Sequence, residues 1–399
     1  MSDLPHQKVQ TRILMAVSQL LSQVGGVEQY LERLIAEHQK SGYDVWLLAG
    51  SLDKKSPQQY CVPEFWKMSH ISKTFDEIAE INPKIFNLHY VPQCFSRMGL
   101  SFGLLLLLWK IRKKLSTHLL ITFHEVYEPF IWSKPWRFFP AFMQRLQWGC
   151  LLLLTHRALF VSPNFCDRVK RYHPWAFSKV EFISIPSNIK LYEATEEREK
   201  KEVCSFFLKN SDEIILGTLS KTLHEGLQLK KLIDIAAALN EMGQKNKVYL
   251  LGAMTEAKPK QREEINRYGK QKAVNLIWSG PLPESELSYQ MQRIDAYVLM
   301  HQEGVSPRNT SFMAALVHGL PIFSAASPQM MPYPEFNSVV NIIEPFTVVQ
   351  VAQKIKAYFE RSREERHQQS VKSLAFYDEH FSLKRHMDRL NQIYSKGQE

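Results

Sequence analysis

The chain has 399 residues, of which 45% are hydrophobic and 23% charged; this composition excludes a disordered protein and, at this length, predicts about two domains. Its five cysteines are odd in number and never form a CxxC pair, which argues against a disulfide framework or a zinc site and favours a reducing compartment. The polar N-terminus lacks the apolar segment of a signal peptide, and no apolar run reaches the roughly 18–20 residues that span a bilayer. We therefore expect a cytoplasmic protein that does not span a membrane.

Nearly all of the net charge of +10 lies in one segment, residues 97–185, which holds thirteen Lys and Arg residues against four Asp and Glu. The segment is also rich in Trp and Phe. A basic, aromatic surface attracts phospholipid headgroups, lipid diphosphates or nucleic acid. We interpret it as a surface for an anionic membrane, which would place the protein peripherally on the inner face. The alternative is a solvated basic face over an ordinary core. No recognised nucleic-acid module occurs, so no nucleic-acid partner is expected.

The first half of the chain alternates between strand and helix patterns. Residues 12–18 are typical of a buried parallel strand, 28–41 have helical apolar spacing, and 43–48 read as the next strand. Strand, helix and strand in this order form a βαβ unit, which implies a parallel sheet covered by helices. The series continues with strands at 85–89, 119–123, 158–162 and 180–185 and a buried helix within 104–115.

A polar, charge-rich stretch at 192–202 is predicted to be a linker or an exposed helix between this series and a second one. The second series has strands at 214–219, 248–251, 275–279, 296–300 and 322–324, and helices at 230–242 and 311–318. The fold class is therefore α/β, with two doubly wound, Rossmann-like domains facing across a cleft. In such domains ligands bind at the carboxyl ends of the strands, so we expect the active site in the cleft.

Gly25 and Gly26 lie between the first strand and the first helix, where small residues let the backbone approach a ligand and the helix start offers N–H groups to a phosphate. A tight turn without a ligand is the alternative. The fingerprint GxGxxG is absent, which argues against an NAD-dependent oxidoreductase.

The chain resembles glycosyltransferase family 4, the GT-B family of retaining sugar transferases. The first loop and helix, GGVEQYLERLIAEHQKSGYDV, are similar to those of the family, and further similar segments follow in the expected order over essentially the whole chain. They are LLITFHE, ALFVSPNF, LIWSGPLPESEL, IDAYVLMHQEGVSPRNTSFMAALVHGLPI and the ending SLAFYDEHFSLKRHMDRLNQIYSK. The ending is similar to the family's closing helix, which crosses back onto the N-terminal domain.

The resemblance implies roles for individual residues. Gly25 and Gly26 would face the donor diphosphate and the transferred sugar. His124 would stand beside the sugar at the reaction centre, although a structural hydrogen-bonding histidine is the alternative. Glu303 and Gly304 match the pair that ends a strand of the C-terminal domain and holds the donor. The family pattern requires no metal, and no DxD-type acidic pair stands at a strand end. We therefore expect no metal and no cofactor other than the donor.

The sequence departs from the family pattern in two places. Many members carry a second glutamate at the position of Ala314, so that carboxylate is missing here. Several side chains near it could form an alternative cradle for the diphosphate, because Arg pairs with phosphate bidentately and a helix start adds N–H groups. They are Ser306, Arg308, Asn309, Thr310 and Ser311. In the second place Thr218 and Glu225 stand near the family's Arg and Lys, and Lys221 is predicted to substitute as the basic residue.

These observations predict an enzyme, a hexosyl-type glycosyltransferase that moves a sugar from a nucleotide-sugar donor, with retention, to a lipid-linked or membrane-proximal glycan acceptor. Polysaccharide, O-antigen or glycolipid synthesis would use such a reaction. The domains are predicted at 1–190 (acceptor side), 191–372 (nucleotide-sugar side) and 373–399 (closing helix). The alternative is a catalytically weakened GT-B protein that binds nucleotide sugars or acts as a partner subunit. A GT-B epimerase or phosphorylase is a further alternative.

Overall fold

The computed structural model describes residues 11–18, 26–51, 58–192, 213–219, 226–252, 259–300, 304–326, 328–330, 332–343 and 347–396. The chain forms two compact units, one of Met1–Ile185 with His386–Glu399 and the other of Pro186–Arg385. This division differs from the expected boundaries at 190 and 372. The chain leaves the first sheet soon after its last strand, and the long helix before residue 381 packs wholly within the second unit.

The first unit is a parallel sheet of seven strands in the order β3-β2-β1-β4-β5-β6-β7. Its strands are β1 (Arg12–Val17), β2 (Asp44–Ala49), β3 (Gln59–Cys61), β4 (Ile85–Tyr90), β5 (His118–Phe123), β6 (Arg157–Phe160) and β7 (Val180–Phe182). Its α-helices among the described residues are α1 (Gly26–Lys40), α2 (Ile71–Ile81), α3 (Pro92–Phe95), α4 (Phe102–Lys114), α5 (Phe138–Leu154), α6 (Pro163–Tyr172) and α15 (Leu383–Ser395).

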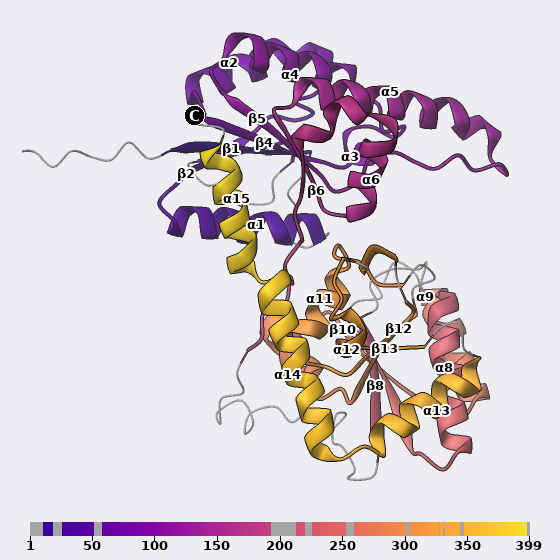
Figure 1. Cartoon of the computed structure of the whole chain (residues 1–399). Coiled ribbons are helices and arrows are strands. Elements are labelled where there is room, and N and C mark those ends of the chain that lie inside the picture. The colour runs from indigo at the N-terminus through magenta and orange to yellow at the C-terminus, as the bar shows by residue number, and fades with distance from the viewer. Residues whose placement is uncertain are drawn as a thin grey trace, which may run out of the picture. The chain divides into compact units, whose positions relative to one another are not determined.

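The two faces of this sheet differ in polarity. Helices α2, α4 and α5 lie over one face, and α1 and α15 lie over the other (Figure 1). Alternate residues of a strand point to opposite faces. On β4 the apolar Phe86, Leu88 and Tyr90 therefore join the core beneath α2, α4 and α5, whereas Asn87 and His89 point toward α1 and α15. The second face is thus buried but carries polar side chains.

The second unit is a parallel sheet of six strands in the order β10-β9-β8-β11-β12-β13. Its strands are β8 (Ile214–Leu219), β9 (Asn246–Leu251), β10 (Asn275–Gly280), β11 (Ala296–Leu299), β12 (Ile322–Ser324) and β13 (Val340–Ile342). Its helices are α8 (Gly226–Glu241), α9 (Pro259–Gln271), α10 (Glu284–Met291), α11 (Thr310–Val317), α12 (Phe336–Val339), α13 (Val348–Phe359) and α14 (Arg363–His380). Helices α8, α9 and α13 cover one face, and α10, α11, α12 and α14 cover the other.

The α/β class and the two parallel, Rossmann-like sheets are as predicted. One closing helix was expected at 373–399, but this part of the chain contains the end of α14 and the whole of α15. Phe381 and Ser382 separate the two helices. Two edge strands, β3 and β13, were not predicted; each has three residues, too few to show a period of two. Of the expected linker 192–202, only Tyr192 is among the described residues. In the part of the chain that is described, no helix is both long and apolar enough to cross a membrane.

Helix α15 returns the end of the chain to the first unit. Met387, Leu390 and Ile393 are buried there at helical spacing. Tyr43 donates a hydrogen bond of 3.1 Å to the side chain of Asn391, and Arg389 forms an ion pair with Glu181. The crossing predicted for the closing helix is therefore made by α15 alone.

His386 fastens the start of α15 to the buried polar face. Its Nδ1 lies 2.7 Å from the carbonyl oxygen of Ser184, to which it donates, so Nε2 is left to accept from the hydroxyl of Tyr30 at 2.8 Å. Burial lowers the pKa of His386 from 6.5 to about 4. Burial likewise lowers the pKa of His38 to about 4 and holds that of His89 well below 6.5.

These depressed pKa values predict that the first unit loses stability as the pH falls from about 6.5 toward 4. In this window the histidines of the unfolded chain bind protons, whereas the buried histidines of the folded chain stay neutral. The free energy of unfolding therefore falls by at most about 1.4 kcal/mol per pH unit for each histidine. Urea unfolding of the intact protein between pH 7 and 5 measures this slope. We expect His386→Gln to be less stable at pH 7 and to show a slope shallower by about one proton.

The matched control is His367→Gln, because His367 is exposed on α14. It should leave both stability and slope unchanged. If His386→Gln had the same pH dependence as the wild type, His386 would not be excluded from protonation in the folded state.

Candidate functional site

In each sheet the order of strands reverses at one place, between β1 and β4 in the first unit and between β8 and β11 in the second. Helices that follow strands on the two sides of such a point cover opposite faces, which leaves a crevice at the carboxyl ends of the strands. The candidate residues gather at these two places. Each unit is described separately below.

In the first unit two histidines meet at the ends of β4 and β5. His89 is the fifth residue of β4, and His124 directly follows β5, where its backbone N–H donates to the carbonyl of Tyr90 at 3.1 Å. Nδ1 of His89 and Nε2 of His124 share a hydrogen bond of 3.1 Å, in which one nitrogen donates and the other accepts. The rings are stacked with centroids 5.4 Å apart. His124 is therefore oriented by His89.

Helix α1 adds Tyr30 to this pair. The Tyr30 ring centroid lies 5.9 Å from that of His89 and 5.8 Å from that of His124, while its hydroxyl is bound to His386. Burial, and secondarily the neighbouring His124, His386 and His38, hold the pKa of His89 well below 6.5. His89 is thus a neutral ring at pH 7. Its Nε2 is buried and finds no hydrogen-bond partner among the residues that the structure describes. His89 and Tyr30 can therefore donate and accept hydrogen bonds without carrying charge.

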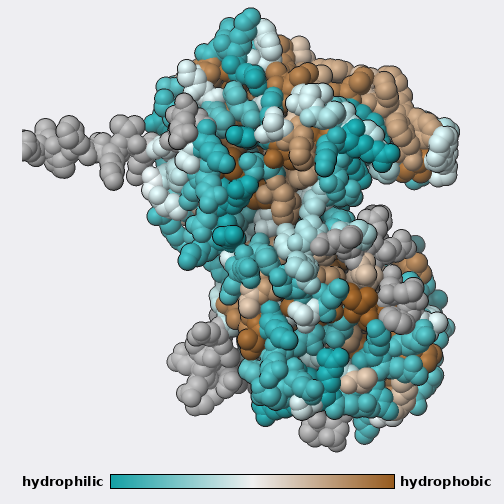
Figure 2. Space-filling model, viewed as in Figure 1, coloured by the Kyte–Doolittle hydropathy of each residue, from teal (hydrophilic) through white to brown (hydrophobic). Residues whose placement is uncertain are grey.

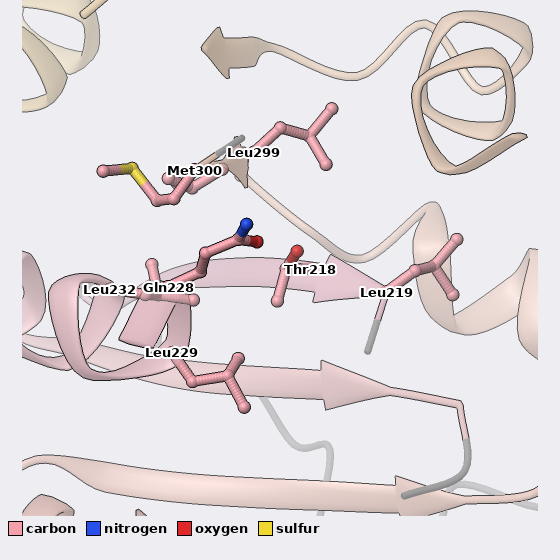
Figure 3. A pocket seen from close by; sticks show the side chains of 8 residues that line it. Thr218, Leu219, Gln228, Leu229, Leu232, Leu299 and Met300 are labelled. Carbon is pink, nitrogen blue, oxygen red and sulfur yellow. The ribbon is translucent and has the colours of Figure 1, made fainter. Parts of the chain in front are cut away.

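In the second unit a cavity of about 320 Å³, including space open to solvent, lies at the reversal point (Figure 3). It is lined by the ends of β8 and β11, the residue after β11, and the start of α8. Its residues are Thr218, Leu219, Gln228, Leu229, Leu232, Val298, Leu299 and Met300. Its lining combines apolar side chains with a few polar groups, as the lining of a ligand site does. Thr218 and Gln228 supply the polar groups.

The loop after β11 leads into α11. Gly304 is buried and has a φ of +69°, a conformation that favours glycine. The side-chain oxygen of Asn309 accepts from the backbone N–H of Ser306 at 2.6 Å and from its hydroxyl at 2.9 Å. Because Asn309 is turned back onto Ser306, it makes no side-chain cap on α11. The first backbone N–H groups of this helix therefore receive no hydrogen bond from the side chain of Asn309. An anion site at a helix start uses N–H groups of this kind.

The structure places part of the predicted diphosphate cradle together. Arg308 is exposed, Asn309, Thr310 and Ser311 are partly exposed at the start of α11, and Ser306 is buried. Gly26 is the first residue of α1. Gly25, Lys221 and Glu303 lie outside the described residues, so their roles stay predictions. Ala314 is fully buried in the core beneath α14.

His89, Tyr30, His386 and Gln228 were not predicted as site residues. His89 has a signal in the sequence, since it lies near the end of a strand next to the one that precedes His124. Gln228 lies on the first turn of the helix that follows β8, again near the carboxyl ends of the strands. Tyr30 and His386 have no such signal, because 356 residues separate them along the chain.

Comparison with known proteins gives a family match for the first unit and similar folds for the whole chain. Residues 24–186 match the model of Glycosyltransferase Family 4. No curated protein matches the chain in sequence. A solved glycosyltransferase from Rickettsia africae is 14% identical over 98% of this chain and 99% of its own, with a TM-score of 0.71.

Two further solved structures are similar along their whole length. Anabaena HepE in complex with UDP-glucose is 13% identical over 97% of this chain and 100% of its own, with a TM-score of 0.67. The lipopolysaccharide outer core galactosyltransferase WaaB is 14% identical over 97% of this chain and 100% of its own, with a TM-score of 0.61. At these identities the likeness shows the GT-B fold, and the family model adds the assignment of the first unit. The first unit therefore matches Glycosyltransferase Family 4, and the whole chain has the fold of the GT-B glycosyltransferases.

Proposed function

We propose that this protein transfers a sugar from a nucleoside-diphosphate sugar, with retention of configuration, to a lipid-linked or membrane-proximal glycan. The second unit binds the donor and the first unit binds the acceptor. The observation that carries the proposal is the cavity at the β8–β11 reversal point together with the uncapped start of α11, which follows the same strand. The cavity suits the base of a nucleotide, and the start of α11 suits its diphosphate.

Both the cavity and the start of α11 support a nucleoside-diphosphate sugar as the donor. Gln228 and Thr218 offer hydrogen bonds to a base held between apolar side chains. Arg308 and the N–H groups of α11 offer positive charge to phosphate oxygens. HepE, which shares the fold, holds UDP-glucose. We propose that these groups hold the diphosphate without a metal.

The acceptor class rests on the first unit. Its segment 97–185 is basic and aromatic, which suits a glycan carried on an anionic lipid. WaaB, which shares the fold, acts in lipopolysaccharide synthesis. We propose polysaccharide, O-antigen or glycolipid synthesis at the inner face of a membrane as the setting.

The chemistry is electrostatic. When the bond between the anomeric carbon and the phosphate oxygen breaks, positive charge develops on the sugar and negative charge on the departing diphosphate. Fixed donors that face the diphosphate lower the barrier because they need no reorganisation. Arg308 and the α11 N–H groups take this role. His124, held by His89, positions the sugar through hydrogen bonds, and Glu303 is proposed to hold the donor sugar.

We predict that one of UDP-, GDP-, ADP- or CDP-sugars selectively raises the melting temperature. At about 100 times its dissociation constant a ligand adds roughly 2.7 kcal/mol to the free energy of unfolding. Gln228→Ala and Arg308→Ala should each lower the affinity for the donor. The first removes a contact to the base, and the second removes a contact to the diphosphate. A thermal-shift titration of each variant, repeated with EDTA, measures the affinities.

Arg363→Ala is the control, because Arg363 is exposed at the start of α14 in the same unit. It should bind the donor as the wild type does. A donor that binds Arg308→Ala with unchanged affinity would contradict the proposed diphosphate site, and loss of binding with EDTA would contradict metal-free binding.

We further predict that His124→Ala lowers the turnover rate by at least about a hundredfold, since a group that acts at the reaction centre contributes on this scale. Donor affinity should stay nearly unchanged, because the base and diphosphate bind the second unit. Single-turnover transfer with radiolabelled donor measures the rate.

The matched control is His118→Ala. His118 is the first residue of β5, so it lies at the opposite end of the strand that His124 follows. It should keep the wild-type rate. A wild-type protein that binds a donor but transfers no sugar to any membrane glycan would instead be a nucleotide-sugar-binding subunit, as the missing carboxylate at Ala314 allows.

A further inference from the structure

The surface of the first unit carries an exposed apolar stripe along α5. Phe139, Phe142, Leu146, Cys150 and Leu153 are exposed, at spacings of three and four residues that place them on one side of the helix. The opposite side of α5, with Trp148 and Leu151, packs in the core. Helix α5 is therefore apolar on both its buried and its exposed sides, whereas a surface helix of a protein surrounded by water presents polar residues outward.

The segment before α5 extends this stripe. Trp132, Trp136 and Phe139 are 85%, 70% and 69% exposed. Figure 2 shows hydrophobic side chains gathered over the part of the molecule where Figure 1 draws α5. We call Trp132, Trp136, Phe139, Phe142 and Leu146 the aromatic surface.

The aromatic surface is held in place from its inner side. The Arg137 side chain donates to the Glu128 carboxylate at 2.6 Å, and the Glu128 backbone N–H donates to Gln144 at 2.7 Å. The Arg145 guanidinium lies 4.0 Å from the ring centroid of Tyr127 and 3.9 Å from that of Phe130. Because polar contacts fasten the inner side, the outward aromatic rings are a fixed feature of the fold.

The charges around the aromatic surface indicate its partner. Residues 129–154 contain Lys134, Arg137 and Arg145 and no acidic residue. Lys113, on α4, lies 5.0 Å from the ring of Trp109, another exposed aromatic residue. Trp and Phe beside lysine and arginine suit the interface of an anionic bilayer, where aromatic rings enter the headgroup region and cations meet phosphates. In a symmetric dimer the same basic surfaces would face each other and repel.

We propose that the aromatic surface inserts into the interface of an anionic membrane, with α5 lying in the plane of the bilayer. The stripe from Phe139 to Leu153 spans about 21 Å at 1.5 Å per residue, long enough for a helix lying on the surface. This inference deepens the proposed membrane-side acceptor, since it names the residues that hold the enzyme there.

The test is flotation of the nucleotide-free protein with vesicles of equal parts phosphatidylcholine and phosphatidylglycerol. The wild type should float with these vesicles and less with pure phosphatidylcholine. Part of the binding should persist at about 1 M salt, where charges are screened within about 3 Å. The triple variant Trp132→Ser, Trp136→Ser and Phe139→Ser should bind at least about tenfold more weakly.

A triple variant in the second unit, Leu191→Ser, Val349→Ser and Val371→Ser, is the matched control, because these residues are also exposed and apolar. It should float as the wild type does. Brominated lipids should quench the tryptophan fluorescence of the wild type more than that of Trp132→Phe/Trp136→Phe, a readout that does not depend on the triple variant folding.

Three results would overturn the proposal. The first is failure of the wild type to float. The second is normal flotation of the aromatic variant, which would leave only charge as the cause of binding. The third is a concentration-dependent dimer formed through the aromatic surface and seen by sedimentation. Donor binding is measured separately by thermal shift without vesicles. Failure of the membrane surface and failure of the proposed transferase activity therefore give different results.

Discussion

Parallel strand pairing is the constraint on which the rest of this structure depends. A parallel strand cannot be joined to its neighbour by a tight turn, so each connection crosses a face of the sheet, here mostly through a helix. All strands of a sheet then end at the same edge, and helices begin there. In the first unit this edge brings His89 beside His124. In the second it brings Thr218 on β8 beside Met300 after β11, with the start of α11 following the same strand.

The buried polar face of the first sheet links the candidate site to the end of the chain. Tyr30 contacts His89 and His124 with its ring and binds His386 with its hydroxyl. The neutral form of His89 and His386 follows from burial, which disfavours the imidazolium. The same burial that keeps these two rings uncharged at pH 7 makes this unit sensitive to acid. The helix that closes the chain and the residues proposed to position the sugar thus belong to one hydrogen-bonded and stacked group.

The departures from the family pattern acquire a physical meaning in the second unit. Ala314 lies in a closed apolar core, where an unpaired carboxylate would be costly. The side chain that could have capped α11, Asn309, instead holds the loop at Ser306. Positive potential at the helix start is left available, and Arg308 stands beside it. The proposed diphosphate site therefore uses backbone and guanidinium where many relatives have a carboxylate nearby.

The sequence by itself determined the class of fold, most of the strands and the edge of each sheet at which the candidate residues lie. Those properties depend on apolar periodicity and on glycines and caps near in sequence, which local interactions encode. It also pointed to His124 and the 306–311 loop. It did not reveal the hydrogen bond between His89 and His124 or the one between Tyr30 and His386. It also did not reveal that Gln228 lines the cavity. Nor did it show which side of α5 is exposed, since that helix has apolar residues on both its buried and its exposed side. Only the tertiary structure decided these points, because contacts between residues distant in the chain depend on how helices settle on a sheet, which no local pattern records.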